Sequence, residues 1–297
     1  MVDLHIHTKF SDGSDNVEQI FKKILKTDIK IFSITDHDTI KGCKYLHNNL
    51  KQDLIKNNLK FINGVELSTR LNGRSIHILA YDFDINNKII AKLIKEGQTL
   101  RKKRILKRIE ILKSKFNIKI SDEDYKKIIK MENAGRPHLA QILMKMGYAG
   151  NLDLPQEKFV KTVHACMQKY LYHSLEEFSL PSEYVIKQLK KANIISIIAH
   201  PLSCKFEKSK SKLTPKEFKL NAKILTKCGL DGLECFYSEY NSDDRALISS
   251  FAKENNLVVS AGSDYHGKHK KIKLGCLGSD IEKVDLNDIT LLKLLNL

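Results

Sequence analysis

Short apolar runs alternate with amphipathic stretches along most of the chain. The runs rich in Ile, Val and Leu predict strands at 2–7, 29–35, 61–67, 76–81, 194–199, 232–236 and 257–260. Stretches with helical spacing predict helices at 17–26, 215–227 and 243–254. Strands that alternate with helices in this way predict an α/β layered structure or barrel.

The hydrophobic period becomes helical in the middle of the chain. It predicts helices over 87–116, over 121–131 with Ser121 as the cap, and from Arg136 to about Gly147. We therefore expect one discontinuous α/β domain, residues 1–98 and 184–297, interrupted by a helical insert domain at 99–183 that contributes to substrate binding.

Metal-type side chains lie within or just after the expected strands. His5 and His7 are two apart on one strand, so both point to the same face. A single histidine on an apolar segment is more often a core residue than a ligand. Here, however, six of the eleven histidines occur at such positions with three carboxylates beside them, which favours one shared site. The candidate metal ligands are His5, His7, Asp12, His37, Glu66, His77, His200, Asp264 and His266.

Imidazole and carboxylate ligands without thiolate suit zinc, manganese or iron. Nine ligands are too many for one ion, so two or three ions that share a carboxylate are expected. Such clusters clamp the attacking and leaving oxygens of a phosphoryl displacement. The sequence therefore predicts phosphoester hydrolysis.

The net charge of +16 favours a phosphorylated or polyanionic partner, although lysine-rich composition explains it equally well. The runs 101–104 and 268–271 are candidate contacts for such a partner, or solvated surface. No apolar stretch is long enough for a membrane span, and the six cysteines include no CxxC pair. We expect a cytoplasmic protein with reduced cysteines and no membrane partner.

At the metal-type motifs the chain resembles the polymerase and histidinol phosphatase (PHP) family of metal-dependent phosphoesterases. The motifs are His5-Ile6-His7 with Asp12, Thr35-Asp36-His37-Asp38, Gly64-Val65-Glu66, Ala199-His200-Pro201 and Ser263-Asp264-Tyr265-His266. The resemblance implies an active enzyme with a distorted, TIM-like (β/α)7 barrel, a helical insertion and a trinuclear site at the C-terminal ends of the strands.

The resemblance also implies a ligand assignment. His5, His7, Glu66 and Asp264 would hold the first ion, Glu66, His77 and His200 the second, and Asp12, His37 and His266 the third. Two or three divalent ions are implied, manganese foremost, with zinc, iron or magnesium as alternatives. A metal-activated hydroxide would attack phosphorus, and Asp264, His200 or His266 would protonate the leaving oxygen.

The segment from Gly135 to His138 resembles the PHP branch that removes phosphate from nucleotides, including 3′,5′-bisphosphates, and whose bacterial members degrade short RNA from the 5′ end. Arg136 and His138 would hold the substrate phosphate, with Arg136 also stabilising charge during catalysis. Alternatively, Pro137 merely begins a helix. Two other functions stay open: a histidinol phosphate phosphatase, and a non-catalytic, metal-stabilised nucleic-acid-binding module. The oligomeric state is also open.

Overall fold

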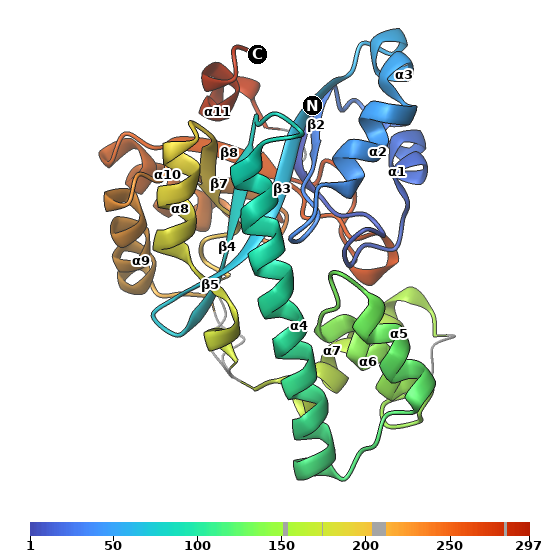
Figure 1. Ribbon diagram of the computed structural model, residues 1–297. Coiled ribbons are helices and arrows are strands. Elements are labelled where there is room, and N and C mark those ends of the chain that lie inside the picture. Colours follow the sequence, from blue (N-terminus) through green and yellow to red (C-terminus); the bar gives the residue numbers. More distant parts are fainter. Residues whose placement is uncertain (151–153, 174, 204–211, 282–283) are drawn as a thin grey trace.

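A computed structural model of the chain describes residues 1–150, 154–173, 175–203, 212–281 and 284–297 (Figure 1). A single sheet curves into an almost closed barrel in the strand order β1-β2-β3-β4-β6-β7-β8, with β5 paired to β3 outside this path. The strands are β1 (Val2–Ile6), β2 (Ile31–Ile34), β3 (Lys60–Leu71), β4 (Arg74–Tyr81), β5 (Leu180–Pro181), β6 (Ile195–Ile198), β7 (Gly232–Tyr237) and β8 (Val258–Gly262). The expected distorted, TIM-like barrel with a helical insertion is confirmed.

The two ends of the sheet meet where β1 approaches the turn after β8. Ile6 forms a parallel bridge with Tyr265, and the His7 N–H donates to the Tyr265 carbonyl at 2.9 Å. The Asp264 N–H donates to the His5 carbonyl at 2.8 Å. Closure therefore places the first and last metal-type motifs of the chain side by side.

One part of the sheet departs from a regular β/α repeat. β4 is antiparallel to both of its neighbours, β3 and β6. It joins β3 through Asn72 and Gly73, whose φ angles of 50° and 72° suit the two-residue Asn-Gly hairpin turn. As a result β3 runs on to Leu71, whereas the apolar run predicted a strand that ends at 67. Glu66 thus lies inside a strand and not at its end, because the hairpin continues the pairing past it.

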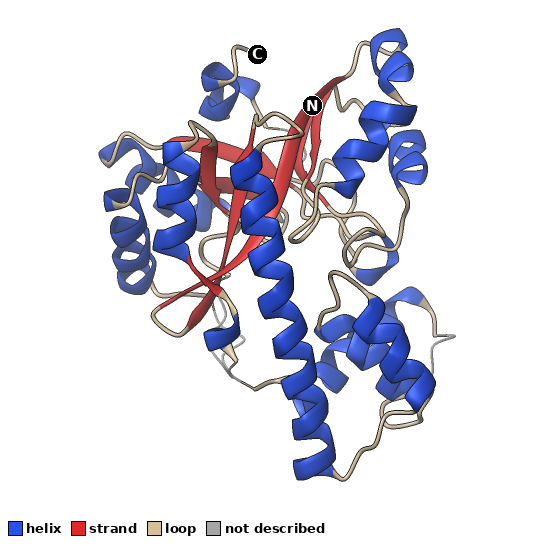
Figure 2. Ribbon diagram, viewed as in Figure 1, coloured by secondary structure: helices blue, strands red, loops and turns tan. Residues whose placement is uncertain are grey.

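Helices cover the outside of the sheet (Figure 2). They are α1 (Val17–Ile24), α2 (Lys41–Asn49), α3 (Lys51–Lys56), α8 (Ser182–Lys191), α9 (Pro215–Lys227), α10 (Ser242–Glu254) and α11 (Thr290–Leu294). The main apolar core lies between the strands and these helices, and a smaller core joins the strands to α11. Across the parts of the chain described above, no helix is both long and apolar enough to cross a membrane. The five cysteines described are all free, and Cys204 lies outside the described residues.

A second group of helices has an apolar core of its own. It consists of α4 (Lys88–Phe116), α5 (Asp122–Lys130), α6 (Arg136–Lys145) and α7 (Gln156–Cys166), followed by a π-helical turn at Met167–Leu171. α4 is continuous and belongs to both parts, since Ile90 packs in the barrel core and Leu112 in the second core (Figure 1). The predicted domain boundary at 98/99 falls inside this helix, and the two-domain division stays a prediction.

A buried ion pair fastens α4 to the barrel. The Nε and Nη2 atoms of Arg101 donate to one oxygen of Asp38 at 2.9 and 2.6 Å, and the Ser68 N–H donates to the other oxygen at 2.9 Å. Burial alone would raise the pKa of Asp38, but the Arg101 charge and the Ser68 N–H lower it below its usual value. The pair therefore stays charged, and it holds the helix against the loop that carries His37.

Candidate metal centre

Two histidines at the end of the first strand, His5 within β1 and His7 directly after it, form the base of the site. The Nε2 atoms of His5 and His7 lie 3.1 Å apart, and both side chains are fully buried. One oxygen of Glu66 lies 3.3 Å from the first and 3.0 Å from the second. One oxygen of Asp264 lies 3.6 and 3.3 Å from the same two nitrogens. Four side chains, from β1, the residue directly after it, β3 and the turn after β8, thus converge on one point.

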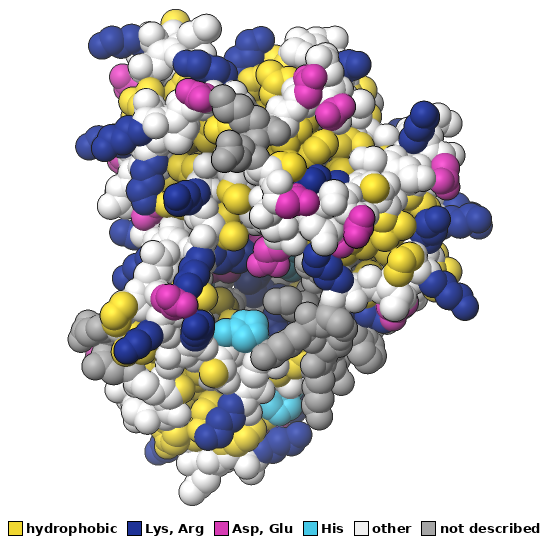
Figure 3. All heavy atoms as spheres, turned by 180° about the vertical axis from the view of Figure 1, so that it is seen from behind, with side chains coloured by type: hydrophobic (Ala, Val, Ile, Leu, Met, Phe, Trp, Pro, Cys, Tyr) yellow, Lys and Arg dark blue, Asp and Glu magenta, His cyan; other side chains and the backbone are white. Residues whose placement is uncertain are grey.

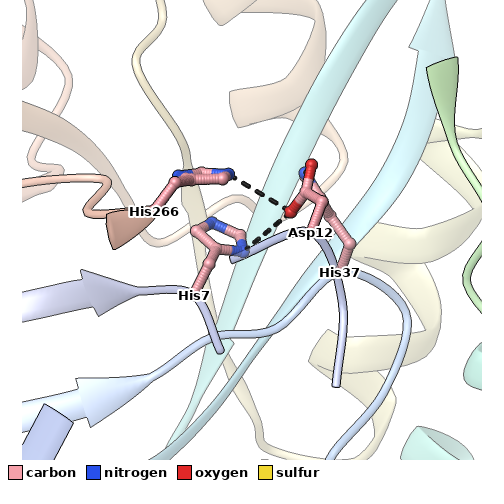
Figure 4. A group of neighbouring side chains, drawn as sticks. All are labelled: His7, Asp12, His37 and His266. Carbon is pink, nitrogen blue, oxygen red and sulfur yellow. Dashed lines mark ion pairs between the residues drawn. The ribbon is translucent and has the colours of Figure 1, made fainter. Parts of the chain in front are cut away.

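A second group lies beside the first and shares His7 with it (Figure 4). One oxygen of Asp12 lies 3.2 Å from Nε2 of His266 and 3.8 Å from Nδ1 of His7. Its other oxygen lies 3.8 Å from Nε2 of His37. The loop after β1, the loop after β2 and the turn after β8 therefore bring one carboxylate and three imidazoles together.

Glu66 lies between these groups and a third one. Its Oε1 atom is 2.7 Å from Nδ1 of His77 and 3.3 Å from Nε2 of His200, while its Oε2 atom is 3.0 Å from Nδ1 of His37. Because its two oxygens face different imidazoles, this carboxylate has the geometry of a bridging ligand. All nine expected side chains thus lie in one cluster, and the ion that each would hold stays a prediction.

The carboxylates of the cluster are held in their charged form. Burial opposes the ionisation of Glu66, but the neighbouring imidazoles, His37 foremost, lower its pKa well below the usual range. For Asp12, His266 and His37 likewise outweigh the effect of burial and lower the pKa strongly. Buried, ionised carboxylates are costly unless a cation or strong donors compensate them.

Several buried polar atoms of the cluster lie close to another side chain of the cluster but make no hydrogen bond of suitable geometry among the described residues. They are Oδ1 of Asp12, Oε2 of Glu66, Nδ1 of His37 and Nδ1 of His200. Buried polar atoms normally have a partner, and exceptions call for a ligand such as an ion. Imidazole and carboxylate donors without thiolate suit manganese, zinc or iron. The residues present therefore fit divalent metal ions.

One buried acid that supports the site was not among the expected residues. Glu234, on β7, faces Nδ1 of His5 at 2.8 Å with one oxygen, and its other oxygen accepts the backbone N–H of His200 at 2.6 Å. A carboxylate behind a histidine fixes its tautomer and directs the other ring nitrogen to the metal. A glutamate inside the otherwise apolar run Gly232–Tyr237 is the sequence signal that would have found it.

The two aspartates that flank His37 have structural roles. Asp38 pairs with Arg101, as described above. Asp36 accepts the Thr8 N–H at 2.7 Å and the Ser11 hydroxyl at 2.6 Å with one oxygen. These bonds hold the turn after β1, and this turn delivers Asp12 to the cluster.

A pocket of about 490 Å³ opens over the cluster. Its lining includes Arg136, from the start of α6, and Lys270, whose ammonium group donates to the Asp264 carboxylate. His138 lines neither this pocket nor the neighbouring one, and its Nδ1 accepts the Gly135 N–H at 3.0 Å. Figure 3 shows histidine and acidic side chains at a hollow flanked by lysine and arginine. The assignment of both residues to substrate binding stays a prediction.

The basic runs fall on different surfaces. Lys268 and Lys271 are exposed, and Lys271 pairs with Glu157. Of residues 268–271, only Lys270 lines the pocket over the cluster. In the run on α4, Arg101 is buried in its ion pair, while Lys102 and Lys103 are exposed.

Comparisons with known proteins agree with this architecture. The chain is 28% identical over 273 residues to a 5′-3′ exoribonuclease of Haemophilus influenzae, and the match covers 92% of each chain. It is 23% identical over 280 residues to a phosphoribosyl 1,2-cyclic phosphate 1,2-diphosphodiesterase of Eggerthella lenta, covering 91% of this chain and 95% of that one. It is 22% identical over 270 residues to a 3′,5′-nucleoside bisphosphate phosphatase of Chromobacterium violaceum, covering 89% and 87%.

The fold also matches a solved structure of a candidate metal-dependent phosphoesterase from Bifidobacterium adolescentis. The TM-score is 0.74 at 24% identity, covering 98% of this chain and 95% of that one. The model of the PHP domain matches residues 3–179. The expected hydrolase of phosphoesters is confirmed at the level of the family, and the chain belongs to the PHP domain family of metal-dependent phosphoesterases.

Proposed function

We propose that the chain is a divalent-metal phosphatase that hydrolyses phosphate monoesters of nucleotides, in particular those of nucleoside 3′,5′-bisphosphates. The observation that carries this proposal is the position of Arg136, which lines the pocket over the nine-residue cluster. A guanidinium beside a metal centre can bind phosphate oxygens through paired N–H groups. The relative named as a 3′,5′-nucleoside bisphosphate phosphatase supports the choice of substrate.

The nine side chains would hold two or three ions, most simply manganese, in the three sets implied by the family resemblance. Such ions supply positive charge at the phosphate oxygens and lower the pKa of water from about 15.7 toward about 7. Glu66 bridges two of the sets through its separate oxygens. Glu234 orients His5, and Lys270 holds the oxygen of Asp264 that is turned away from His5 and His7.

The remaining steps belong to groups on the pocket wall. Arg136 orients the phosphate and stabilises the charge that develops on its non-bridging oxygens. The leaving oxygen takes its proton through Asp264, His200 or His266, all of which line the pocket. Burial opposes the ionisation of Asp264, but Lys270 and the neighbouring imidazoles hold its pKa well below its usual value, so this carboxylate would first have to take the proton from water. His138 supports Arg136 through its bond to the Gly135 N–H at the start of the same helix.

A second candidate function is stepwise degradation of short RNA from the 5′ end. The relative named as a 5′-3′ exoribonuclease is 28% identical over 92% of the chain, which favours it. Removal of a nucleotide and removal of a phosphate both break a P–O bond at the same metal centre. The two activities can therefore coexist in one site.

A substrate panel with the manganese-loaded protein tests the proposal. The panel contains a nucleoside 3′,5′-bisphosphate, the 3′- and 5′-monophosphates, histidinol phosphate and short 5′-phosphorylated RNAs. We expect fastest turnover of the bisphosphate, and loss of turnover with chelator and in His7→Ala. His47→Gln is the matched control, since His47 lies outside the cluster and bonds Asn63. Turnover confined to histidinol phosphate, or unaffected by chelator and by His7→Ala, would overturn the proposal. RNA binding without turnover would favour the non-catalytic module.

A further inference from the structure

A groove runs outward from the metal centre along α7. The pocket over the cluster shares His164 and Gln168 with a second hollow, of about 680 Å³. That hollow shares Lys161, Ala165 and Lys169 with a third one, of about 470 Å³. Each hollow thus adjoins the next, and we call the two outer ones together the α7 groove. A chain molecule whose end lies at the metal centre can continue into this groove.

The shape of the groove follows from the spacing along the helix. Lys161, Ala165 and Lys169 are four residues apart, so they lie on one face of α7 and of the π-helical turn after it. All three are exposed, and the small side chain of Ala165 leaves room between the two lysines. Gln168 and Lys169 belong to the π-helical turn itself. Such turns are rare and occur frequently at functional sites, and this one coincides with the hollows.

The groove carries positive charge that is only weakly engaged. Two lysines, Lys161 and Lys169, are among its described lining residues, and no aspartate or glutamate is. Lys161 pairs with Glu157 at 3.0 Å, but Glu157 also pairs with Lys271 at 2.8 Å, so one carboxylate faces two ammonium groups. The side chains of these pairs are at least half exposed, and exposed pairs contribute little to stability. The lysines of the groove can therefore turn to the phosphates of a bound strand.

An aromatic pair lies at the outer end of the groove. Tyr170 lines the third hollow, and the Tyr148 ring packs edge-on against it with the ring centres 6.1 Å apart. Tyr148 is 40% exposed and directly precedes Ala149 and Gly150, which line the same hollow. The Nζ atom of Lys169 lies 4.8 Å from the centre of the Tyr170 ring. A basic groove with an exposed aromatic ring suits single-stranded nucleic acid, because lysines attract the phosphates and bases stack on the ring.

We infer that the α7 groove binds the downstream nucleotides of a short, single-stranded RNA whose 5′-terminal nucleotide lies at the metal centre. The inference rests on the second candidate function, degradation of RNA from the 5′ end, and deepens it by placing the rest of the strand. The pocket over the cluster, at about 490 Å³, lies within the range of roughly 300–1,000 Å³ that holds one small ligand, so it can take one nucleotide. The nucleotides that follow need a surface outside it, and the adjoining groove has the charge to bind them.

The contacts in the groove are of a kind that tolerates any sequence. Ammonium groups attract phosphates regardless of the base, and every base has a face that can stack on a tyrosine. Each added nucleotide should therefore strengthen binding until the groove is filled. This binding energy is present before and during cleavage alike, so it should lower KM and leave kcat unchanged. A nucleoside 3′,5′-bisphosphate has no downstream nucleotides, so its turnover should not depend on the groove.

The test compares Lys161→Gln/Lys169→Gln with Lys126→Gln/Lys130→Gln, which makes the same change of charge at exposed lysines of α5 that line none of the three hollows. The manganese-loaded proteins are assayed on a nucleoside 3′,5′-bisphosphate and on 5′-phosphorylated RNAs of two to about six nucleotides. In the groove variant, kcat/KM on the longest RNA should fall roughly tenfold through KM, while kcat/KM on the bisphosphate stays unchanged. The slope of log(kcat/KM) on this RNA against log(salt concentration) should become less negative by about 1.4, because two phosphate contacts are lost at about 0.7 each. The α5 variant should match the wild type in both.

Tyr148→Leu tests the stacking contact, with Tyr125→Leu as the control. Tyr125, on α5, is 39% exposed and lines none of the three hollows. Loss of the Tyr148 ring should weaken binding of the longest RNA by about fivefold or more, as loss of one stacked base implies. Binding of the dinucleotide should stay unchanged, since only a longer strand reaches the outer end of the groove.

The outcomes separate this inference from the proposed function. If no RNA is cleaved, fluorescence anisotropy with a 3′-labelled RNA and the same manganese-loaded proteins still tests the groove, and weaker binding in the groove variant alone would support it. Lys161→Arg/Lys169→Arg, which keeps both charges, should bind RNA like the wild type. RNA cleavage or binding that is equal in the wild type and the groove variant would overturn the inference, even if the enzyme degrades RNA. An equal loss on the bisphosphate, or the absence of both RNA cleavage and RNA binding in the wild type, would also overturn it. Thermal unfolding identifies any variant that fails to fold.

Discussion

Replacement of Arg101 by methionine would remove the cation that compensates the Asp38 carboxylate. The carboxylate is 1% exposed, and it would keep only the bond from the Ser68 N–H among those of the ion pair. Breaking one side of a buried ion pair costs about 3–5 kcal/mol, because the remaining charge stays buried. We therefore expect Arg101→Met to lower the free energy of unfolding by about that amount at pH 8.

The dependence on pH identifies the cause. In the wild type the pKa of Asp38 is lowered, so its contribution to stability is present above the unfolded value of about 3.9 and is lost as the pH falls. Without Arg101, burial raises the pKa of Asp38, and the carboxyl takes up a proton on folding. The deficit of the variant should then shrink as the pH falls from 8 to 5, by up to about 1.4 kcal/mol per pH unit.

Urea denaturation of the chelator-treated protein, followed by circular dichroism at pH 5 and pH 8, measures both effects. Lys102→Met is the control, since this exposed neighbour should change stability by less than about 0.5 kcal/mol. In Arg101→Met/Asp38→Asn the cost should be smaller than the sum of the two single changes. A cost below about 1 kcal/mol at both pH values would refute the reasoning, because it would mean that the pair behaves like an exposed one.

Three further predictions concern the metal centre. Glu234→Gln should weaken manganese binding, measured by calorimetry, about 10- to 100-fold, because His5 loses its carboxylate partner. Glu239→Gln makes the same change at an exposed residue of the pocket wall and should leave the affinity unchanged. Equal affinities of the two variants would contradict the prediction. Gly262→Ala should lower manganese affinity and thermal stability together, because a Cβ at residue 262 would lie 2.2 Å from the Cβ of His5. If the variant bound manganese as tightly as the wild type, the close approach of the two residues would be unimportant. Lys270→Met should reduce kcat/KM on the best substrate by roughly tenfold, because the hydrogen bond to Asp264 is lost. Lys268→Met is the control and should have no effect. Similar rates for the two variants would argue against a role for Lys270.

The sequence indicated the cluster well because its signal is local. His5 and His7 alternate with Leu4 and Ile6, and that period of two already places both imidazoles on one face. The sequence says less about the role of each side chain where one short motif holds several polar residues. Asp36, His37 and Asp38 are consecutive, and only the fold decides which of them points into the site. The apolar run alone places Glu66 at a strand end, whereas the Asn72-Gly73 hairpin turn extends β3 beyond it.

Long-range partners were beyond any local pattern. Glu234 lies 229 residues from His5, and the pairing follows only from barrel closure. The arginines of α4 looked like part of a lysine-rich surface because a linear run does not reveal which side of a helix meets a neighbour. The use of the His138 imidazole to cap α6 likewise depends on how this helix begins.

The closure of the barrel has a consequence for biosynthesis. Asp3 accepts hydrogen bonds from Ser263, 260 residues later, and His7 meets Asp264 and His266 only across this seam. During translation the N-terminal histidines therefore emerge long before the other side chains of the cluster. Contacts between such distant segments form slowly. Until the eighth strand leaves the ribosome, the set of side chains that would hold the metal ions is incomplete, so stable loading would have to follow translation.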